Sequence, residues 1–269
     1  MITLSRLMLD PYSRSVQKEL SDPYQMHRTL CHAFPGLSDE EWKNTRVLFR
    51  IDDDDERLSL LVQSQRAPDW DAFAAHLRDK RYMLGAPQCT LWKSVEEQLE
   101  EGAFRLKEGQ RLRFRLQGNP VWAPKEKGAR SSTRRGLYRE AERLDWLKRQ
   151  SDQHGFSLDY EHHENGEPKP TCLQSREIVR NEKIEKAPVV FRGREYDKLE
   201  IVLPLCEVVD LNDGKRFALP TQKHQFSAAR FDGLLRVSDA EKFAHAVENG
   251  IGKARGFGFG LLSVAPANS

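Results

Sequence analysis

Two neighbouring segments with strict apolar alternation constrain the fold of this chain most strongly. Apolar side chains stand at positions 47, 49 and 51 of the first segment and at 58, 60 and 62 of the second. A period of two residues is typical of half-buried antiparallel strands. The acidic residues 52–56 lie between the segments, so we expect a hairpin with an acidic, solvated tip that is not a metal site.

The segments around this hairpin predict the rest of a first domain. Residues 2–9 and 110–117 have strand character, and residues 23–34 and 69–80 have helical character. Residues 83–108 fit neither pattern and are expected to decorate the unit. The resulting order, β-α-β-β-α-β, is the ferredoxin-like arrangement. We therefore predict an N-terminal ferredoxin-like domain at residues 1–122.

A second unit of the same kind is predicted after a basic linker at residues 123–136. A helix is expected from about residue 137 to His154-Gly155, with strands around residues 198–209 and 225–237. Ser238 and Glu241 form a capping box for another helix that ends at Asn249-Gly250. The predicted fold class is α+β, with two tandem ferredoxin-like (RRM-like) domains built on antiparallel sheets, the second at residues 137–269.

Composition narrows the class of protein. Of the 269 residues, 38% are hydrophobic and 31% are charged, which is typical of a soluble globular protein. The four cysteines form no C-x-x-C pair, so neither a zinc knuckle nor a disulfide framework is indicated. No stretch approaches the ~18 apolar residues of a membrane span. We expect a cytoplasmic protein with no membrane association and no cofactor.

Positive charge is concentrated locally although the formal net charge is only +2. Residues 125–149 contain nine Lys or Arg against four Asp or Glu. Such a stretch is either a phosphate-binding patch or a solvated linker and helix face. A second group, Arg111, Arg113 and Arg115, shares one face of a predicted strand. There, either a bound anion or acidic residues on an adjacent strand would offset the repulsion.

The segment "DPYQMHRTL", residues 22–30, carries candidate chemistry. Asp22 suits a helix N-cap and Pro23 the first helical position. Tyr24 and His27 then share one face beside the helix N-terminus, which attracts phosphate. An acid/base group and a phenol at this place suit RNA cleavage by its own 2′-OH. A purely structural histidine and tyrosine are the alternative.

The segment "GIGKARGFGFGLLSVAP", residues 250–266, is the other unusual motif. It fits neither the Rossmann fingerprint, because Arg255 stands at the third glycine position, nor a P-loop, because a strand follows it. "RGFGF" matches the start of the RNP1 pattern, whose aromatic side chains stack on bases. RNP1 lies on an inner strand, whereas only one short strand follows here. RNA is therefore the candidate ligand, by a mode other than RNP1 stacking.

Taken together, these pieces resemble the CRISPR-associated repeat-processing endoribonucleases of type I-E systems, the CasE family. The resemblance rests on the opening strand and on five segments in family order: "DPYQMHRTL", "RLRFRLQGNP", "EAERLDWLKRQ", "FDGLLRVSDAEKF" and the glycine-rich segment. It implies an enzyme that binds the repeat hairpin in precursor crRNA and cleaves at its 3′ base. The implied reaction is metal-independent, leaves a 2′,3′-cyclic phosphate, and is followed by retention on mature crRNA within Cascade.

The resemblance also implies site residues. The catalytic histidine falls on His27 and the active-site tyrosine on Tyr24, while glycines of the loop let backbones approach closely. Lys253 and Gln117 stand where the family commonly has proline and arginine, and no hairpin-binding residues are assigned within residues 160–222. A non-cleaving hairpin-binding subunit is the alternative function. The expected RNA contacts are Arg28, Arg113, Arg115, Arg134, Arg135, Gly252, Lys253, Arg255, Gly256 and Gly258.

Overall fold

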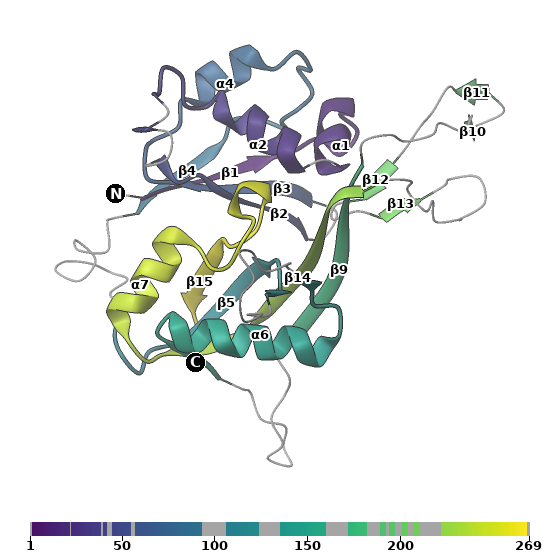
Figure 1. The fold of residues 1–269 in the computed structure, drawn as a ribbon. Coiled ribbons are helices and arrows are strands. Elements are labelled where there is room, and N and C mark those ends of the chain that lie inside the picture. Colours follow the sequence, from purple (N-terminus) through teal and green to yellow (C-terminus); the bar gives the residue numbers. More distant parts are fainter. Residues whose placement is uncertain are drawn as a thin grey trace.

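The computed structural model shows two units, each built on an antiparallel sheet and stacked one above the other in Figure 1. None of the helices in the described ranges combines the length and the apolar character that a transmembrane span requires. The residues described are 2–21, 23–38, 40–41, 45–54, 57–92, 106–123, 135–159, 172–181, 189–191, 194–196, 201–203, 207–209 and 222–267.

The first unit contains the predicted hairpin. Phe49 pairs with Val62 and Ile51 with Leu60, and the sheet order is β2-β3-β1-β4. Helices cover one face of this sheet, and their apolar side chains meet those of the strands in one core. The elements are β1 (Ile2–Met8), α1 (Arg14–Ser21), α2 (Pro23–Cys31), β2 (Leu48–Asp54), β3 (Arg57–Ser64), α4 (Trp70–His76) and β4 (Gln88–Trp92).

The second unit repeats this topology. Its sheet contains the order β15-β5-β14-β8, with β9 as an additional strand beside β14. When β9 is set aside, the fourth, first, third and second strands of each sheet lie side by side in that order. Three fully buried phenylalanines, Phe156, Phe231 and Phe243, lie in its core. The elements are β5 (Arg111–Gly118), α6 (Glu140–Gln153), β8 (Phe156–Asp159), β14 (Gln222–Val237), α7 (Ala240–Asn249) and β15 (Leu262–Pro266).

One strand lies in a different sheet from the one expected. The segment at residues 110–117 was predicted to complete the first sheet, but it forms β5 of the second sheet, between β14 and β15. Its place beside β1 is taken by β4, within the segment expected only to decorate the unit. Because each sheet needs its own four strands, we propose that the boundary between the units lies between β4 and β5 rather than at residue 122.

Further strands extend the second unit. The first part of β14 pairs with β9 and the last part with β8, so these two strands share β14 as a partner, in addition to its pairing with β5 (Figure 1). Short pairs complete the described strands: β6 with β7, β10 with β11 and β12 with β13. Their bounds are β6 (Val121–Trp122), β7 (Arg135–Gly136), β9 (Cys172–Asn181), β10 (Val189–Phe191), β11 (Arg194–Tyr196), β12 (Ile201–Leu203) and β13 (Glu207–Val209).

Several helix ends differ from the predictions. The helix α4 ends at His76 rather than at residue 80, and α6 begins at Glu140 rather than at about residue 137. The helix that contains His27 ends at Cys31 and continues as turns, three residues before the predicted end. The N-cap of α7 is Asp239 rather than Ser238, because the Asp239 carboxylate accepts a hydrogen bond from the Lys242 N–H. A carboxylate at this position satisfies a free N–H and complements the helix dipole, so it serves as well as the serine expected from the capping box.

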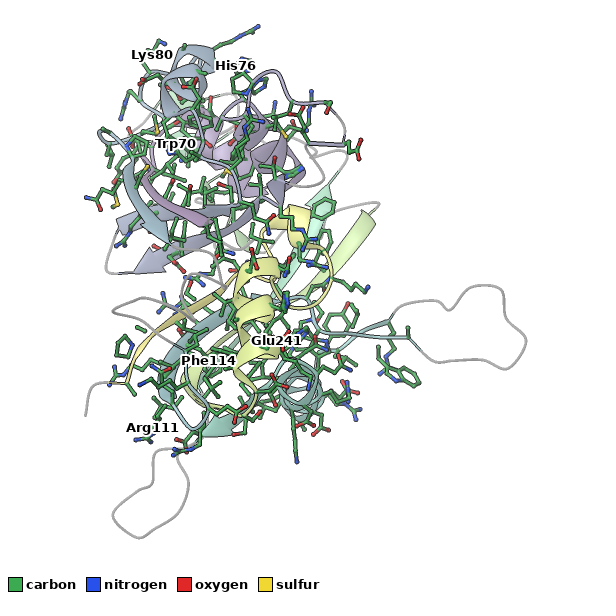
Figure 2. All side chains as sticks on the ribbon, turned by 90° about the vertical axis from the view of Figure 1, so that its left-hand side faces the viewer. Trp70, His76, Lys80, Arg111, Phe114 and Glu241 are labelled. Carbon is green, nitrogen blue, oxygen red and sulfur yellow. The ribbon has the colours of Figure 1, made fainter. Side chains whose placement is uncertain are left out.

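The two units contact each other through buried polar groups as well as apolar ones. The Gln63 side chain on β3 donates to the backbone oxygens of Val247 and Glu248 at the end of α7, at 2.8 and 3.1 Å. The segment between α7 and β15, drawn in yellow, then passes between the units (Figures 1 and 2). The C-terminal part of the second unit is thereby held against the first sheet.

Candidate active site

His27 and the glycine-rich segment, more than 220 positions apart in the sequence, meet between the units. The segment contains a short 3-10 helix, η1 (Arg255–Phe257), which packs against α2. A Cβ atom added to Gly256 would lie 3.8 Å from Cε1 and 3.9 Å from Nδ1 of the His27 ring. The imidazole is half-buried, so one part of it contacts the loop and another part reaches solvent.

Burial adjusts the acid/base character of this histidine. Desolvation in the contact with the loop lowers the pKa of His27 below its ordinary value of about 6.5. The neutral imidazole therefore dominates at pH 7. A neutral ring can accept a proton from a hydroxyl group, which is the role of a general base.

The inner face of α2 is anchored by a buried carboxylate that the sequence analysis did not identify. Thr29 and Tyr82 each donate a 2.6 Å hydrogen bond to the carboxylate of Glu19, which lies on α1. Desolvation raises the pKa of Glu19, and the two hydrogen bonds oppose that rise. Met26 beside His27 is fully buried. The helix is thus fixed from within, while His27 faces the loop.

Glycines at both ends of the loop make its closure possible. Ile251 N–H donates to the Gly260 carbonyl at 2.8 Å, and Gly260 N–H donates to the Gln117 carbonyl at 2.7 Å. Gly260 has a φ of +88°, and a Cβ there would lie 2.7 Å from the Ile251 oxygen. Gly258 lies against the ring of Phe49 on β2. The loop therefore closes on itself and rests on the first sheet.

The aromatic residues of this loop pack inside the protein. Phe259 is fully buried, and its ring lies 5.5 Å from that of Phe226 on β14. Phe257 is half-buried, 5.0 Å from the same ring. Rings used in this way cannot stack on bases as RNP1 aromatics do. The similarity of "RGFGF" to RNP1 therefore has no functional meaning here.

Cationic side chains are exposed on α2 and on the loop. Arg28 is exposed on α2, and Lys253 and Arg255 are exposed on the loop. Arg255 donates to the Asn249 carbonyl at the end of α7, at 2.5 Å, which ties its guanidinium to the loop's base. Gly252, also predicted to contact RNA, lies against Trp146 of α6. Exposed cations of this kind are suited to neutralising RNA phosphates.

The arginines of β5 do not form a uniform anion-binding row. Arg113 is exposed and has no ion pair with the described residues. The other two have acidic partners. The partner of Arg115 lies on the adjacent strand β14, as the second interpretation expected, whereas the partner of Arg111 lies on β8, two strands away. Arg115 donates to Asp232 at 2.5 Å and approaches Asp52 at 3.5 Å, and Arg111 donates to Asp159 at 2.7 Å.

The remaining predicted residues are only partly described. Tyr24 lies in the first turn of α2, and its side chain is outside the described part of the structure, as is Arg134. Arg135 is exposed on β7, with its guanidinium 3.8 Å from the Glu142 carboxylate. The position that commonly carries arginine holds Gln117, which is buried and supplies a backbone acceptor to the loop.

Comparison with known proteins gives consistent matches over the length of the chain. It is 29% identical over 265 residues to the CRISPR-associated endoribonuclease Cse3 of Thermus thermophilus, covering 98% of this chain and 99% of that protein. It is 26% identical over 254 residues to the CRISPR system Cascade subunit CasE of Escherichia coli, covering 91% and 92%.

A solved structure supports the same relationship. Thermus thermophilus Cse3 bound to an RNA representing a pre-cleavage complex has a TM-score of 0.61 and 28% identity, covering 98% of this chain and 99% of that one. The family model described as CRISPR associated protein matches residues 3–266. Because that match includes both sheets, α2 and the glycine-rich loop, this chain belongs to the CRISPR associated protein family.

Proposed function

We propose that this protein is an endoribonuclease that binds the CRISPR repeat hairpin in precursor crRNA and cleaves at its 3′ base. The single observation that carries the proposal is the contact of the half-buried His27 ring with Gly256 in a loop bearing two exposed cations. The related Cse3 is named an endoribonuclease, and its complex with a pre-cleavage RNA has the same fold. These names support the substrate class proposed here.

The proposed reaction is an internal transesterification. His27, neutral at pH 7, accepts the proton of the 2′-OH next to the scissile phosphate. The 2′ oxygen forms a bond to phosphorus, the bond from phosphorus to O5′ breaks, and O5′ gains a proton. The products are a 2′,3′-cyclic phosphate and a 5′-OH, with no change in oxidation state and no required metal.

Other groups of the site have supporting roles in this proposal. Lys253 and Arg255 neutralise the phosphate, whose negative charge is spread over more oxygens as the reaction proceeds. Tyr24 orients the 2′-OH or donates to the phosphate. Because the relative from Escherichia coli is named a Cascade subunit, we also propose that the protein stays on the mature crRNA as part of such a complex.

The test uses the repeat RNA in EDTA, beside a copy with a 2′-deoxy nucleotide at the junction. Cleavage of the first RNA and not of the second is expected. Dependence on added magnesium would contradict the metal-independent reaction. No product after long incubation would contradict the endoribonuclease and favour the alternative, a non-cleaving hairpin-binding subunit.

The residue assignment has its own test. His27→Ala should slow single-turnover cleavage by about 10²- to 10⁴-fold, the usual contribution of a general base, while hairpin affinity is retained. The matched control is His76→Ala, because His76 is exposed on α4 at the far end of the first unit (Figure 2). Equal loss of binding and cleavage in His27→Ala would contradict a catalytic role.

A further inference from the structure

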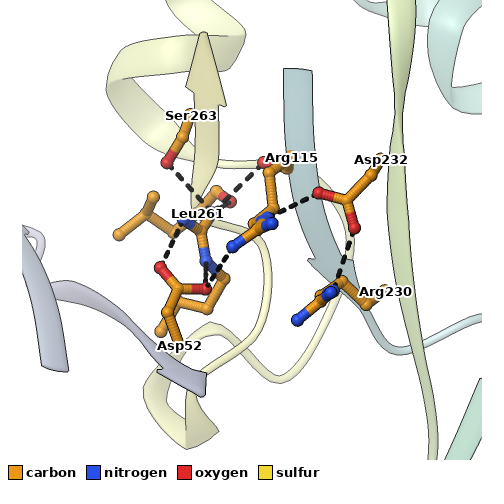
Figure 3. Close-up of polar contacts among 7 residues, drawn as sticks. Asp52, Arg115, Arg230, Asp232, Leu261 and Ser263 are labelled. Atoms are coloured by element: carbon orange, nitrogen blue, oxygen red, sulfur yellow. Dashed lines mark hydrogen bonds and ion pairs between the residues drawn. The ribbon is translucent and has the colours of Figure 1, made fainter. Parts of the chain in front are cut away.

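A buried guanidinium on the first sheet holds the exit of the catalytic loop. Arg50 on β2 is only 3% exposed. Its Nε and Nη2 donate to the two oxygens of Asp52, both at 2.8 Å, so the pair is bidentate (Figure 3). Its Nη1 faces three oxygens of the second unit: Ser263 Oγ at 2.9 Å, the Arg115 carbonyl at 3.2 Å and the Leu261 carbonyl at 3.4 Å.

The positions of these acceptors matter more than their number. Leu261 directly follows Gly260, the last glycine of the loop, and Ser263 is the second residue of β15. The Arg50 guanidinium therefore binds the chain immediately after the C-terminal end of the loop. Phe49, the neighbour of Arg50 on β2, lies beneath Gly258 of the same loop. One strand thus both supports the loop and binds its exit.

Alternating charges keep Asp52 ionised and hold it beside Arg50. Asp52 also approaches Arg115, which donates to Asp232, and Asp232 accepts a further 2.9 Å hydrogen bond from Arg230 (Figure 3). Burial opposes ionisation of Asp52, but the hydrogen bonds from Arg50 and the nearby guanidiniums lower its pKa below the ordinary value. The carboxylate therefore stays charged at neutral pH and continues to accept both donors of Arg50.

Stability alone does not account for such a pair. Transferring two charges from water to the interior is costly, and a well-packed apolar pair of similar size is often as stable. A guanidinium differs in geometry, because its donors are fixed in one plane and bind only acceptors placed to match. The Arg50 donors match acceptors on β2, β5 and β15 at once.

We propose that Arg50, held by Asp52, is a positioning residue that fixes the glycine-rich loop against His27. The proposal rests on the proposed function, since it assigns a role in the same active site. Arg50 does not touch RNA in this proposal. It fixes the distance between η1 and α2, and it thereby keeps Gly256 next to the imidazole.

The experiment compares Arg50→Lys and Asp52→Asn with the wild-type chain. Lysine keeps the charge but cannot form the fork, and asparagine keeps the shape but removes the charge. The matched control is Arg111→Lys, because Arg111 forms an ion pair with Asp159 on the surface and its side chain is 44% exposed. Two quantities are measured: the pKa of His27 by NMR of its ring protons, assigned with His27→Ala, and the single-turnover rate at saturating hairpin RNA.

In both variants, the His27 pKa should rise toward about 6.5, because a displaced loop leaves the ring more hydrated. Cleavage should slow by about 10- to 100-fold, the effect of a misplacement of about 1 Å, while the hairpin Kd changes less than about twofold. The control should match the wild type in both measurements. A lowered melting temperature with unchanged titration and rate would overturn the proposal and leave Arg50 a structural residue.

The proposal can still be tested if the charge variants do not fold or if the wild-type protein does not cleave. If the charge variants do not fold, Ser263→Ala removes one acceptor at the loop exit without unbalancing the buried charges, and the same two shifts, smaller in size, are expected. An unchanged His27 titration in that variant would then overturn the proposal. If the wild-type protein does not cleave repeat RNA, the proposed function fails, and the His27 titration still tests the positioning role by itself.

Discussion

The acid/base character of His27 depends on its surroundings in the fold. A histidine one turn from a tyrosine near a helix start is common, and the sequence alone left a structural role open. In the structure, the His27 ring lies against Gly256, and burial lowers its pKa. The same contact that brings the ring to the loop therefore keeps it neutral and able to accept a proton.

The lowered pKa predicts the pH dependence of cleavage. A base works only when unprotonated, so the acid limb of kcat/KM, which reports the free enzyme, should have its midpoint below about 6.5. The measurement is kcat/KM for the repeat hairpin between pH 4.5 and 8 at constant ionic strength. Activity that falls as the pH rises through the His27 pKa, with this fall lost in His27→Ala, would mean that the imidazole acts as the acid instead.

The same shift affects stability in a fixed direction. The unfolded chain's imidazole binds a proton at about pH 6.5, before the folded one does, so folding becomes less favourable as the pH falls below that value. Denaturation midpoints of wild type and His27→Ala measured at pH 7.5 and pH 5.5 should therefore converge at the lower pH. If the midpoints of the two proteins fall by the same amount between pH 7.5 and pH 5.5, His27 does not contribute to the acid sensitivity of folding.

At the scale of single residues, the sequence predicted those whose partners are close in the chain. That Tyr24 and His27 lie three residues apart on one helix follows from helix periodicity, and exposure of Lys253 and Arg255 follows from their charge. Glu19 and Tyr82 were not identified because their hydrogen bond joins positions 63 residues apart. Asp52, expected in a solvated tip, instead lies buried on β2, because Arg50 and Arg115 offset its charge.

Among the elements, the loop between α7 and β15 depends most on residue type. Its glycines are not equivalent, since Gly260 has positive φ and no space for a Cβ, whereas the nearest atom to a Cβ on Gly256 would be 3.8 Å away. Loop composition could be recognised from the sequence. Which glycine is required for closure, and which for contact with His27, could not.

This difference gives a paired prediction. Gly260→Ala should lower the free energy of unfolding by about 1–3 kcal/mol, because the new Cβ meets the Ile251 oxygen in a left-handed conformation. Gly256→Ala should stay within about 1 kcal/mol of the wild type, since the added methyl group makes ordinary contacts. Chemical denaturation measures both. If both variants lose the same free energy of unfolding, the loop does not close as described.

Elements with local signals were predicted well, and those defined by pairing were not. The hairpin of β2 and β3 follows from alternation, and its strands pair Phe49 with Val62 and Ile51 with Leu60. The segment at residues 110–117 was correctly identified as a strand but was assigned to the wrong sheet. Its partners, β14 and β15, lie more than 100 residues further along, and side-chain alternation does not specify which strand is the neighbour.

Over the whole molecule, RNA binding must come from local charge, because the formal net charge is only +2. The exposed Arg135 and the neighbouring Arg134 belong to the basic stretch that precedes α6. Replacing both with alanine should weaken hairpin binding and reduce the slope of log K against log salt by about 1 for each phosphate that is no longer neutralised. Fluorescence anisotropy at several salt concentrations measures this slope.

The control for this measurement is Lys80→Ala, because Lys80 is exposed at the end of the first unit farthest from the loop (Figure 2). Its slope should equal that of the wild type. An unchanged slope in the double variant would exclude residues 134 and 135 from phosphate contact, and the basic stretch would then be a solvated helix face.

The assembly of the two units also has a consequence for the order of synthesis. A ribosome completes α2 early, but Gly260 and β15 are added more than 220 residues later, on the order of tens of seconds at usual elongation rates. During that interval the nascent chain has the imidazole and lacks the loop that covers it. An incomplete chain therefore lacks the packing of the loop against α2 on which the proposed activity depends.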